Sequence, residues 1–377
     1  MIYLDHNATT PMDPEVLEAM RPHFLAGGNA ESRHAAGRRA RRAWEDARES
    51  VARILGADPS EVIFTSGGTE ANNLAIFGLA RAELGPGHVV SSPIEHPAVA
   101  EPVAHLQADG FDVDRPEVDA EGLADARRMA ECFGGRTRLA TLMLANNETG
   151  AIQPVQELAG LAIPRGIPVH TDAVQAVGRI PVHFHALGVS SLAASAHKFH
   201  GPVGVGLLLV KRGVRLRSWL LGGGQQQGRR PGTVAVPLAV GLAKALELWH
   251  AQAAARSARW ASLRDRLEST LISALGPGRV VRNGPGDDAR RLPQTLNLGF
   301  VGLDGDALLM KLDLAGIAAS LGSACSSGAS RPSPTLLAMR VPEDRLRSSV
   351  RFSLGAATTD ADIDEAAARI IESIRTD

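Results

Sequence analysis

The sequence is short of several kinds of residue, and each shortage excludes a class of protein. Only two cysteines occur among 377 residues, which is too few for a disulfide framework and favours a reducing, cytoplasmic compartment. No run of about 18 apolar residues is present, so the sequence predicts no membrane-spanning helix. The opening residues lack both a basic region and an apolar core, and we therefore expect no secretory signal.

An excess of charge of one sign is also missing. The 40 lysines and arginines nearly balance the 41 aspartates and glutamates, so we expect no direct partner among nucleic acids or anionic membranes. Residues 38–42 are basic, but acidic residues follow at helical spacing, which predicts a solvated helix face with i,i+4 ion pairs. Lysine is rare, and the only candidate catalytic amines are Lys198, Lys211, Lys244 and Lys311.

Apolar residues are present in sufficient number for a large core. They make up 44% of the chain, and the length suggests about two or three domains. The expected strands lie at 61–65, 88–91, 139–144, 167–171, 191–196 and 205–210, with helices beginning near 69, 97 and 155. This alternation predicts an α/β fold in which a largely parallel sheet has helices on both faces.

A second unit follows a long helical region. We expect one helix over 239–250 and a connecting helix over 251–275. Beyond them the sequence predicts strands at 295–300 and 349–354, helices from 304 and 360, and a glycine- and serine-rich loop at 322–330. The boundary between the two units is placed near residue 255.

Two residues at the ends of expected strands carry recognisable chemistry. Lys198 follows strand 191–196, where a lysine can point into a cleft, lose its proton and form a Schiff base. Asp172 ends another strand, at the edge where open α/β sheets bind ligands, and a carboxylate there suits the protonated ring nitrogen of pyridoxal phosphate (PLP). Taken alone, Lys198 is better explained as an ordinary surface lysine, and a helix N-cap is a common alternative explanation of Asp172.

A third element is the turn Ser66-Gly67-Gly68-Thr69-Glu70, which lies between a strand and a helix. Its glycines expose backbone N–H groups, the start of a helix favours an anion, and Thr69 adds a hydroxyl donor. Alone, such a turn is a weak signal. Together with Lys198 and Asp172 it supplies a phosphate site, an amine and a partner for a ring nitrogen, which predicts PLP as cofactor without defining the reaction.

The chain resembles the class V aminotransferase family of fold-type I PLP enzymes and, more narrowly, the cysteine desulfurases of the NifS/IscS type. The resemblance runs in family order from the first residues to about residue 360. The matching segments are YLDHNATTP (3–11), FTSGGTEANN (64–73), EHPAV (95–99), NNETG (146–150), HTDAVQ (170–175), SAHKFHGP (195–202), RPGT (230–233), GSAC (322–325) and SSVRFSLG (348–355).

The resemblance implies a fold and a division of the chain. The expected large domain, residues 16–255, binds PLP on a mostly parallel seven-stranded sheet covered by helices. The expected small domain, residues 256–377, is α+β and carries the loop with Cys325. Residues 1–15 would pack near the small domain and the active site. The chain ends soon after Gly355, so we do not carry over the mode of scaffold docking that uses a longer tail.

The resemblance also assigns roles around the cofactor. Lys198 would hold it covalently and then move protons, Asp172 would keep its ring nitrogen protonated, and Gln175 would bond its phenolic oxygen. His96 would stack on the ring and serve in proton transfer. Six further residues are implied to contact ligands. Asn147 would touch cofactor and substrate, Arg351 would bind the substrate carboxylate, and the phosphate would be held by Gly68, Thr69, Ser195 and His197.

A threonine matching Thr233 completes the phosphate site of the neighbouring subunit in the family, which implies a homodimer. Without the resemblance, His96 is a helix-start histidine, Asn147 a loop asparagine, Arg351 a solvated strand residue and the RPGT segment a surface turn.

Cys325 determines the reaction that the resemblance implies. It lies among Gly, Ala and Ser, without bulky apolar neighbours, as a reactive thiolate does. Its thiolate would attack the sulfur of L-cysteine, keep that sulfur as a persulfide and leave L-alanine as product. The sulfur would pass to an acceptor such as an iron–sulfur scaffold. We expect no resident metal, with Cys325 at most a transient iron–sulfur ligand, and we expect Cys132 to pack as a small hydrophobe.

Two other functions stay open on the sequence. A selenocysteine lyase or an aminotransferase would have the same cofactor site, with Cys325 incidental to the reaction. A non-catalytic sulfur carrier would retain the fold, bind no cofactor and show no turnover, but the presence of Lys198, Asp172 and Cys325 argues against it. The sulfur acceptor is also left open, among iron–sulfur scaffolds, nitrogenase maturation, thiolated tRNA and a molybdenum cofactor.

Overall fold

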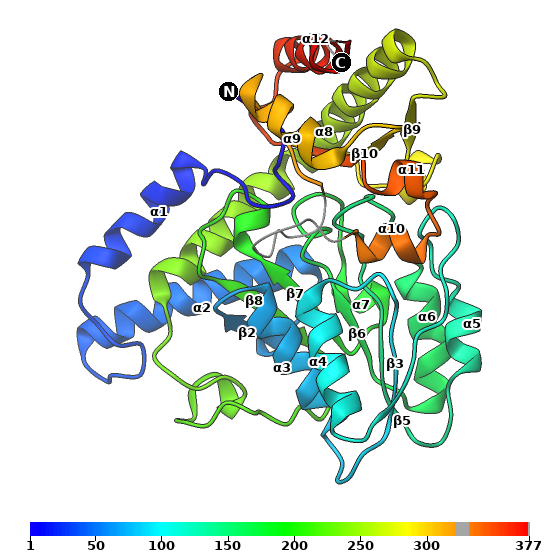
Figure 1. Ribbon diagram of the computed structural model, residues 1–377. Helices are drawn as coiled ribbons and strands as arrows, with labels where there is room; N and C mark the ends of the chain where they lie inside the picture. The colour runs from blue at the N-terminus through cyan, green and yellow to red at the C-terminus, as the bar shows by residue number, and fades with distance from the viewer. Residues whose placement is uncertain (322–331, 376–377) are drawn as a thin grey trace.

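The computed structural model describes residues 1–321 and 332–375 (Figure 1). Its main sheet has seven strands in the order β2-β8-β7-β6-β5-β3-β4. Their bounds are β2 Val62–Thr65, β3 His88–Val90, β4 Asp112–Asp114, β5 Thr137–Thr141, β6 Val169–Asp172, β7 Ser191–Ser195 and β8 Gly206–Val210. Strand β8 runs antiparallel to both neighbours, while the other pairs are parallel. The predicted mostly parallel sheet of seven strands is therefore confirmed.

Both faces of the sheet are covered, and strands β6, β7 and β8 as well as the edge strand β2 are buried along their whole length. Helix α3 and helix α4 pack together beside β3 and β5, and α2 packs on α8. The helices of this part are α1 Pro14–Leu25, α2 Ala35–Leu55, α3 Gly68–Ala80, α4 Pro97–Ala108, α5 Ala126–Glu131, α6 Val155–Ala162 and α7 Phe184–Leu187.

The basic run at 38–42 lies on α2, as predicted. Arg41 pairs with Glu45 and Arg42 pairs with Asp46, both one helical turn away and both partly exposed. The opposite side of α2 is apolar and buries Trp44 and Val51. The charged face is therefore a solvated helix surface, and the helix is held by its apolar face.

The second part of the molecule lies at the top of Figure 1 and is built on a three-stranded antiparallel sheet, β12-β10-β9. Its strands are β9 Val280–Arg282, β10 Thr295–Phe300 and β12 Ser349–Ser353, and its helices are α9 Gly305–Leu314, α10 Pro334–Ala338, α11 Glu343–Leu346 and α12 Asp360–Arg375. A short parallel pair joins β1 Ile2–Tyr3 to β11 Ile317–Ala318, so the N-terminal residues lie against this part. The 3-10 helices are η1 Pro59–Glu61, η2 Ile163–Arg165, η3 Ala196–Lys198, η4 Gln225–Gly228 and η5 Asp288–Arg290.

One helix, α8 Val236–Leu275, connects the two parts (Figure 1). The sequence predicts two helices that meet at residue 250, but the helix continues without a break because alanine and arginine, both good helix formers, dominate residues 251–259. The first half of α8 packs into the core of the seven-stranded part, and the second half packs with β10, β12 and α12. A single long helix thus contributes to both cores.

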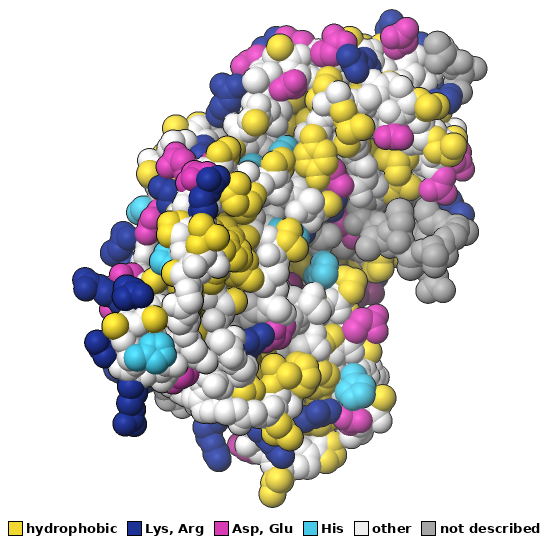
Figure 2. All heavy atoms as spheres, turned by 90° about the vertical axis from the view of Figure 1, so that its left-hand side faces the viewer, with side chains coloured by type: hydrophobic (Ala, Val, Ile, Leu, Met, Phe, Trp, Pro, Cys, Tyr) yellow, Lys and Arg dark blue, Asp and Glu magenta, His cyan; other side chains and the backbone are white. Residues whose placement is uncertain are grey.

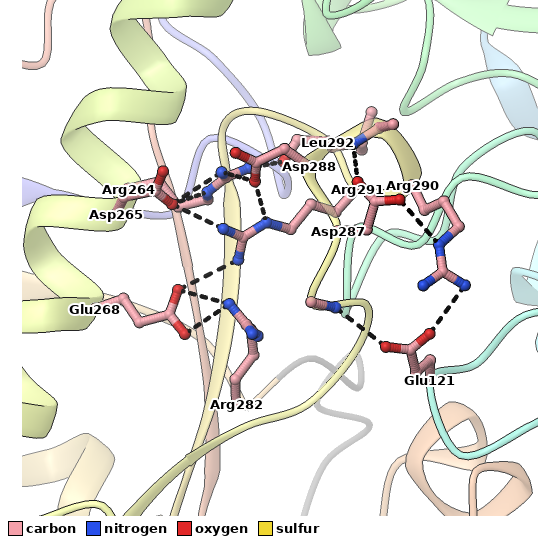
Figure 3. A network of polar contacts seen from close by, with 12 residues as sticks. Glu121, Arg264, Asp265, Glu268, Arg282, Asp287, Asp288, Arg290, Arg291 and Leu292 are labelled. Atoms are coloured by element: carbon pink, nitrogen blue, oxygen red, sulfur yellow. Dashed lines mark hydrogen bonds and ion pairs between the residues drawn. The ribbon is translucent and has the colours of Figure 1, made fainter.

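A network of arginines and carboxylates fixes α8 to the segment before β10 (Figure 3). Arg264 of α8 is 1% exposed and bonds Asp288 at 2.6 Å. Arg291 is 6% exposed and bonds three carboxylates, Asp265 at 2.8 Å, Asp288 at 2.8 Å and Glu268 at 3.2 Å. Each buried guanidinium therefore has acidic partners, and these partners hold η5 against the helix.

Among the described helices, none combines the length and the apolar character needed to cross a bilayer.

Candidate active site

A cavity of about 230 Å³ lies where β6 and β7 end and where α3 and α4 begin. It brings together nine residues that the sequence analysis singled out. They are Gly68, Thr69, His96, Asn147, Asp172, Gln175, Ser195, His197 and Lys198. The carboxyl ends of neighbouring parallel strands meet at one edge of a sheet, so residues far apart in sequence converge there.

Lys198 ends η3, directly after β7, and its side chain points into the cavity. Its amine donates to two backbone carbonyls, Asn7 O at 2.6 Å and Ala8 O at 2.8 Å. Burial, together with the positive charges of Arg351 and Arg179, lowers the pKa of Lys198 to about 8. A substantial share of the amine is therefore neutral near physiological pH, as a nucleophile toward an aldehyde must be.

Asp172 is the last residue of β6 and is 5% exposed. One carboxylate oxygen accepts the backbone N–H of Val174 at 2.9 Å, and the other accepts Nδ2 of Asn72 at 2.7 Å. Both oxygens thus have a fixed donor, and the side chain lines the cavity. A carboxylate held in this way is suited to face a cationic nitrogen of a bound ring.

The start of α3 forms an anion-binding corner of the cavity. Gly67 precedes the helix and provides no capping side chain, so the first N–H groups are available to a ligand. A Cβ atom at Gly68 would lie 2.7 Å from Val174 Cγ2, so only glycine allows the helix to approach the chain beyond β6 this closely. Ser195 lies beside this corner, since a Cβ atom at Gly68 would be 3.5 Å from Ser195 Cβ, and His197 lines the same cavity.

His96 caps α4, and its Nδ1 accepts the backbone N–H of Ala98 at 3.0 Å. Burial lowers the pKa of His96, while the charge of Asp172 opposes that effect. The neutral ring therefore carries its proton on Nε2. The residue is a helix-start histidine and a cavity residue at once, so the two interpretations of this position are compatible.

Two carboxyl groups near the cavity carry raised pKa values. Glu95, next to His96, is buried, and burial together with the negative charge of Asp172 raises its pKa to about 8. One of its oxygens accepts the N–H of Met143, and the other has no partner among the described residues. Because its pKa is about 8, Glu95 is largely protonated near neutral pH. Burial also raises the pKa of Glu148.

Gln175 and Arg351 each leave a polar atom without a partner among the described residues. Gln175 donates to Asn7 O at 3.0 Å, and its Oε1 is unpaired. Arg351 of β12 is 4% exposed, pairs with Asp5 at 2.6 Å and donates to Asn147 O at 3.1 Å, but its Nε is unpaired. Arg351 does not line the cavity, but it hydrogen-bonds Asn147, which does. A ligand that extends past Asn147 would therefore meet a buried guanidinium whose Nε–H is free to donate a hydrogen bond.

Besides Arg351, one described residue among those predicted lies outside the cavity lining. Thr233 is exposed, beyond η4, and is not part of the cavity lining. Cys325 lies outside the described residues. Cys132, by contrast, is partly buried, packs against the main core and has its thiol 3.6 Å from Arg128 O. Burial raises the pKa of Cys132, which agrees with the prediction that it packs as a small hydrophobe.

Sequence reasoning missed several residues that shape the site. Asn72 and Met143 line the cavity, and Asn7 supplies the carbonyl shared by Lys198 and Gln175. Asn7 and Asn72 lie within segments that carry the family resemblance, but no local pattern assigns them a task. Their roles follow from contacts between distant parts of the chain.

The comparisons with known proteins agree with this geometry. Residues 2–366 match the model of the aminotransferase class-V family, and the chain belongs to that family. A protein of Trichormus azollae named cysteine desulfurase is 44% identical over 381 residues, which cover 100% of this chain and 94% of the relative.

Two solved structures extend the agreement to the fold. A structure described as a NifS-like protein superposes with a TM-score of 0.92 at 34% identity, covering 100% of this chain and 99% of the other. A structure described as SspA in complex with cysteine has a TM-score of 0.81 at 33% identity, covering 95% of this chain and 100% of the other. The chain is thus similar to NifS-like proteins in both sequence and fold.

Proposed function

We propose that this protein is a PLP-dependent cysteine desulfurase, which removes sulfur from L-cysteine and releases L-alanine. The observation that carries the proposal is the single cavity shared by Lys198, Asp172 and the open start of α3. Family membership and the similarity to proteins named cysteine desulfurase support the reaction type. The residues present fit PLP, because the cavity offers an amine of lowered pKa, a carboxylate for the ring nitrogen and an anion corner for the phosphate.

When bound, PLP supplies an electron sink that makes the bonds around the substrate's α-carbon labile. Lys198 would hold it, Asp172 would face its ring nitrogen, and the phosphate would lie at Gly68 and Thr69 with Ser195 and His197. Gln175 and His96 would contact the ring. Residues 16–255 would form the domain that binds it, and residues 256–377 the smaller domain, with residues 1–15 between them.

The chain's own groups then have separate tasks. Lys198 has a pKa of about 8, so its amine can take and return a proton near neutral pH. Arg351 would bind the substrate carboxylate through its unpaired Nε, held in place by Asp5 and by Asn147 O. Cys325 would take the substrate's sulfur: its thiolate forms the S–S bond of a persulfide as the carbon–sulfur bond of the substrate breaks.

We further propose a homodimer in the cytoplasm that delivers sulfur to an acceptor protein such as an iron–sulfur scaffold. Apolar side chains exposed on one face support a second copy of the chain. Groups of hydrophobic side chains lie among cationic ones on the face that carries α1 (Figure 2). Exposed apolar residues on α1 and in the segment after β8 are Leu17, Phe24, Leu25, Trp219 and Leu221. In such a dimer Thr233 would serve the partner's phosphate site.

The test is sulfide release from L-cysteine in the presence of a thiol reductant, with L-alanine measured in parallel. The wild-type protein should release both sulfide and L-alanine. In Cys325→Ala the rate of sulfide release should fall by about 100-fold or more, because this variant lacks the nucleophile. Cys132→Ala is the matched control and should behave as wild type.

Equal release from wild type and Cys325→Ala would contradict the persulfide step and favour a lyase-type reaction. If wild type holds PLP and turns over selenocysteine but not cysteine, the substrate assignment is wrong.

A further inference from the structure

A line of buried polar side chains continues from Asp172 away from the cavity. Asn72 of α3 bonds Asp172 Oδ2 at 2.7 Å, and the same side chain lies 3.0 Å from His170 Nε2. His170 of β6 in turn lies 2.8 Å from Ser191 Oγ of β7 through its Nδ1. Asn72 is 1% exposed, and His170 and Ser191 are fully buried. Three elements of the fold therefore meet in one chain of hydrogen bonds that ends on Asp172.

The direction of these hydrogen bonds follows from the chemistry of the groups. A carboxylate only accepts, so Asn72 presents its Nδ2 amide to Asp172 and turns Oδ1 toward His170. His170 must then donate from Nε2 to that oxygen, which leaves Nδ1 to accept the hydroxyl proton of Ser191. Burial lowers the pKa of His170 to about 3, so the ring is neutral and has one donor and one acceptor, as this arrangement requires.

All three bonds thus point the same way, from Ser191 through His170 and Asn72 to the carboxylate. Aligned hydrogen bonds in a low-dielectric interior polarise one another and strengthen the last bond of the series. The other oxygen of Asp172 accepts the N–H of Val174. The carboxylate therefore has one donor on each oxygen and cannot rotate without losing one of them.

We propose that Asn72, supported by His170 and Ser191, is a positioning relay that fixes the Asp172 carboxylate toward the ring nitrogen of PLP. The proposal rests on the proposed function, since it assumes that PLP is the cofactor. None of the three residues hydrogen-bonds the Lys198 amine, which donates to Asn7 O and Ala8 O. His170 and Ser191 lie outside the cavity lining, so their effect on the cofactor would pass through Asn72 and Asp172. Glu95, His96 and Lys198 are the titratable groups that interact with Asp172, and each stays intact in the variants below.

The experiment measures the affinity of the apoprotein for PLP and the pH titration of the bound cofactor's visible absorbance, from about pH 6 to about pH 10. Asn72→Leu removes the donor to Asp172 at similar volume and should weaken PLP binding by about tenfold or more. The visible absorbance follows protonation of the imine nitrogen between Lys198 and PLP. Its midpoint should move upward, by about half a unit or more, because a ring nitrogen with a poorly held partner loses its positive charge more easily and then no longer disfavours the imine proton.

The second position separates the hydrogen bond from the shape of the side chain. His170→Phe keeps a ring but removes both nitrogens, and should weaken PLP binding by about three- to tenfold with the same direction of shift. His170→Gln retains an N–H donor for Asn72 Oδ1 and should restore the wild-type midpoint. Because these two variants share one position, they test the relay even where Asn72→Leu fails to fold.

Asn283→Leu is the matched control. Asn283 is also a buried amide, bonded to Asn297 and Ser349 in the smaller part of the molecule, so its loss should lower stability without moving the titration. The relay is wrong if the variants at Asn72 and His170 bind PLP and titrate as wild type does, or if His170→Gln behaves like His170→Phe. Failure of wild type itself to bind PLP would instead overturn the proposed function.

Discussion

Two regions of this molecule bury cationic side chains with different partners, and the pKa values of these side chains shift in opposite directions. In the network around α8 and η5, Arg264 and Arg291 are almost fully buried, and each has carboxylate partners within 2.6–3.2 Å (Figure 3). Burial alone would lower the pKa of Arg291, but its bonds to Asp288 and Glu268 raise it instead. In the candidate active site, the partners of the Lys198 amine among the described residues are two backbone carbonyls, and its pKa falls to about 8.

The difference separates structural from functional polarity. Where every charge has a partner, the polar groups hold two segments together and gain nothing from a ligand. Where atoms such as Arg351 Nε and Gln175 Oε1 have no partner among the described residues, a ligand can supply one and gain binding energy by doing so. The following variants test that distinction, from the largest expected effect to the smallest.

Lys198→Ala should abolish function and spare the fold. It removes the amine of lowered pKa from the cavity, so turnover of L-cysteine should fall by at least about 10²–10⁴-fold, and the visible absorbance of PLP attached to the protein should be lost. Lys211→Ala, at an exposed lysine beyond β8, is the control. A Lys198→Ala protein with wild-type turnover would refute the assignment of this lysine.

Arg291→Ala should lower the stability of the fold and leave the cofactor site unchanged. Its loss leaves Asp265, Glu268 and Asp288 short of a donor, and the free energy of unfolding should fall by about 1.5–3 kcal/mol, measured by urea denaturation. PLP affinity should stay at the wild-type value. Arg290→Ala removes half-exposed ion pairs to Glu121 and Asp287 and should cost about 1 kcal/mol or less. Equal losses from the two variants would show that burial of the pairs is unimportant.

Glu95→Gln should change how stability depends on pH. The pKa of Glu95 in the folded protein, about 8, lies above its ordinary value of 4.5, so between these values the folded state holds a proton that the unfolded chain has lost. The contribution of this group to the free energy of unfolding therefore falls as pH rises, by at most about 1.4 kcal/mol per pH unit. Glutamine mimics the protonated acid and removes that slope.

Urea denaturation across about pH 5 to about pH 8 measures the slope. Glu95→Gln should gain stability relative to wild type as the pH rises, whereas Glu101→Gln, at an exposed position of α4, should follow wild type throughout. A wild-type slope in Glu95→Gln would mean that Glu95 is ionised in the folded protein.

The parts of the fold and site that the sequence predicts are those marked by local patterns. Asp172, Lys198 and the turn at 66–70 each follow an apolar strand, so their convergence on one edge of a parallel sheet could be expected. Strand 139–144 was expected to be longer than it is, and β5 ends at Thr141. Beyond that end, Leu144 is still buried and donates its N–H to Asp172 O of β6. The run of apolar residues therefore predicts which residues are buried better than it predicts where the strand ends.

Long-range contacts carry no such signal. The carbonyls of Asn7 and Ala8 reach Lys198 from about 190 residues away, and Asn72 of α3 reaches His170 of β6. The fusion of two expected helices into α8 was missed for a related reason, since helix propensity continues through residue 255 while the packing partners change. These features depend on which surfaces of the folded chain come into contact, and no local sequence pattern predicts those contacts.

The most direct test of the contrast between the two regions is to find which lysine binds PLP. Wild-type protein is incubated with PLP, its covalent lysine linkage is reduced with borohydride, and the labelled peptide is identified by mass spectrometry. The account predicts label on Lys198 alone, because its buried amine has a pKa of about 8. Label divided among Lys198, Lys211, Lys244 and Lys311, or absent from Lys198, would contradict it.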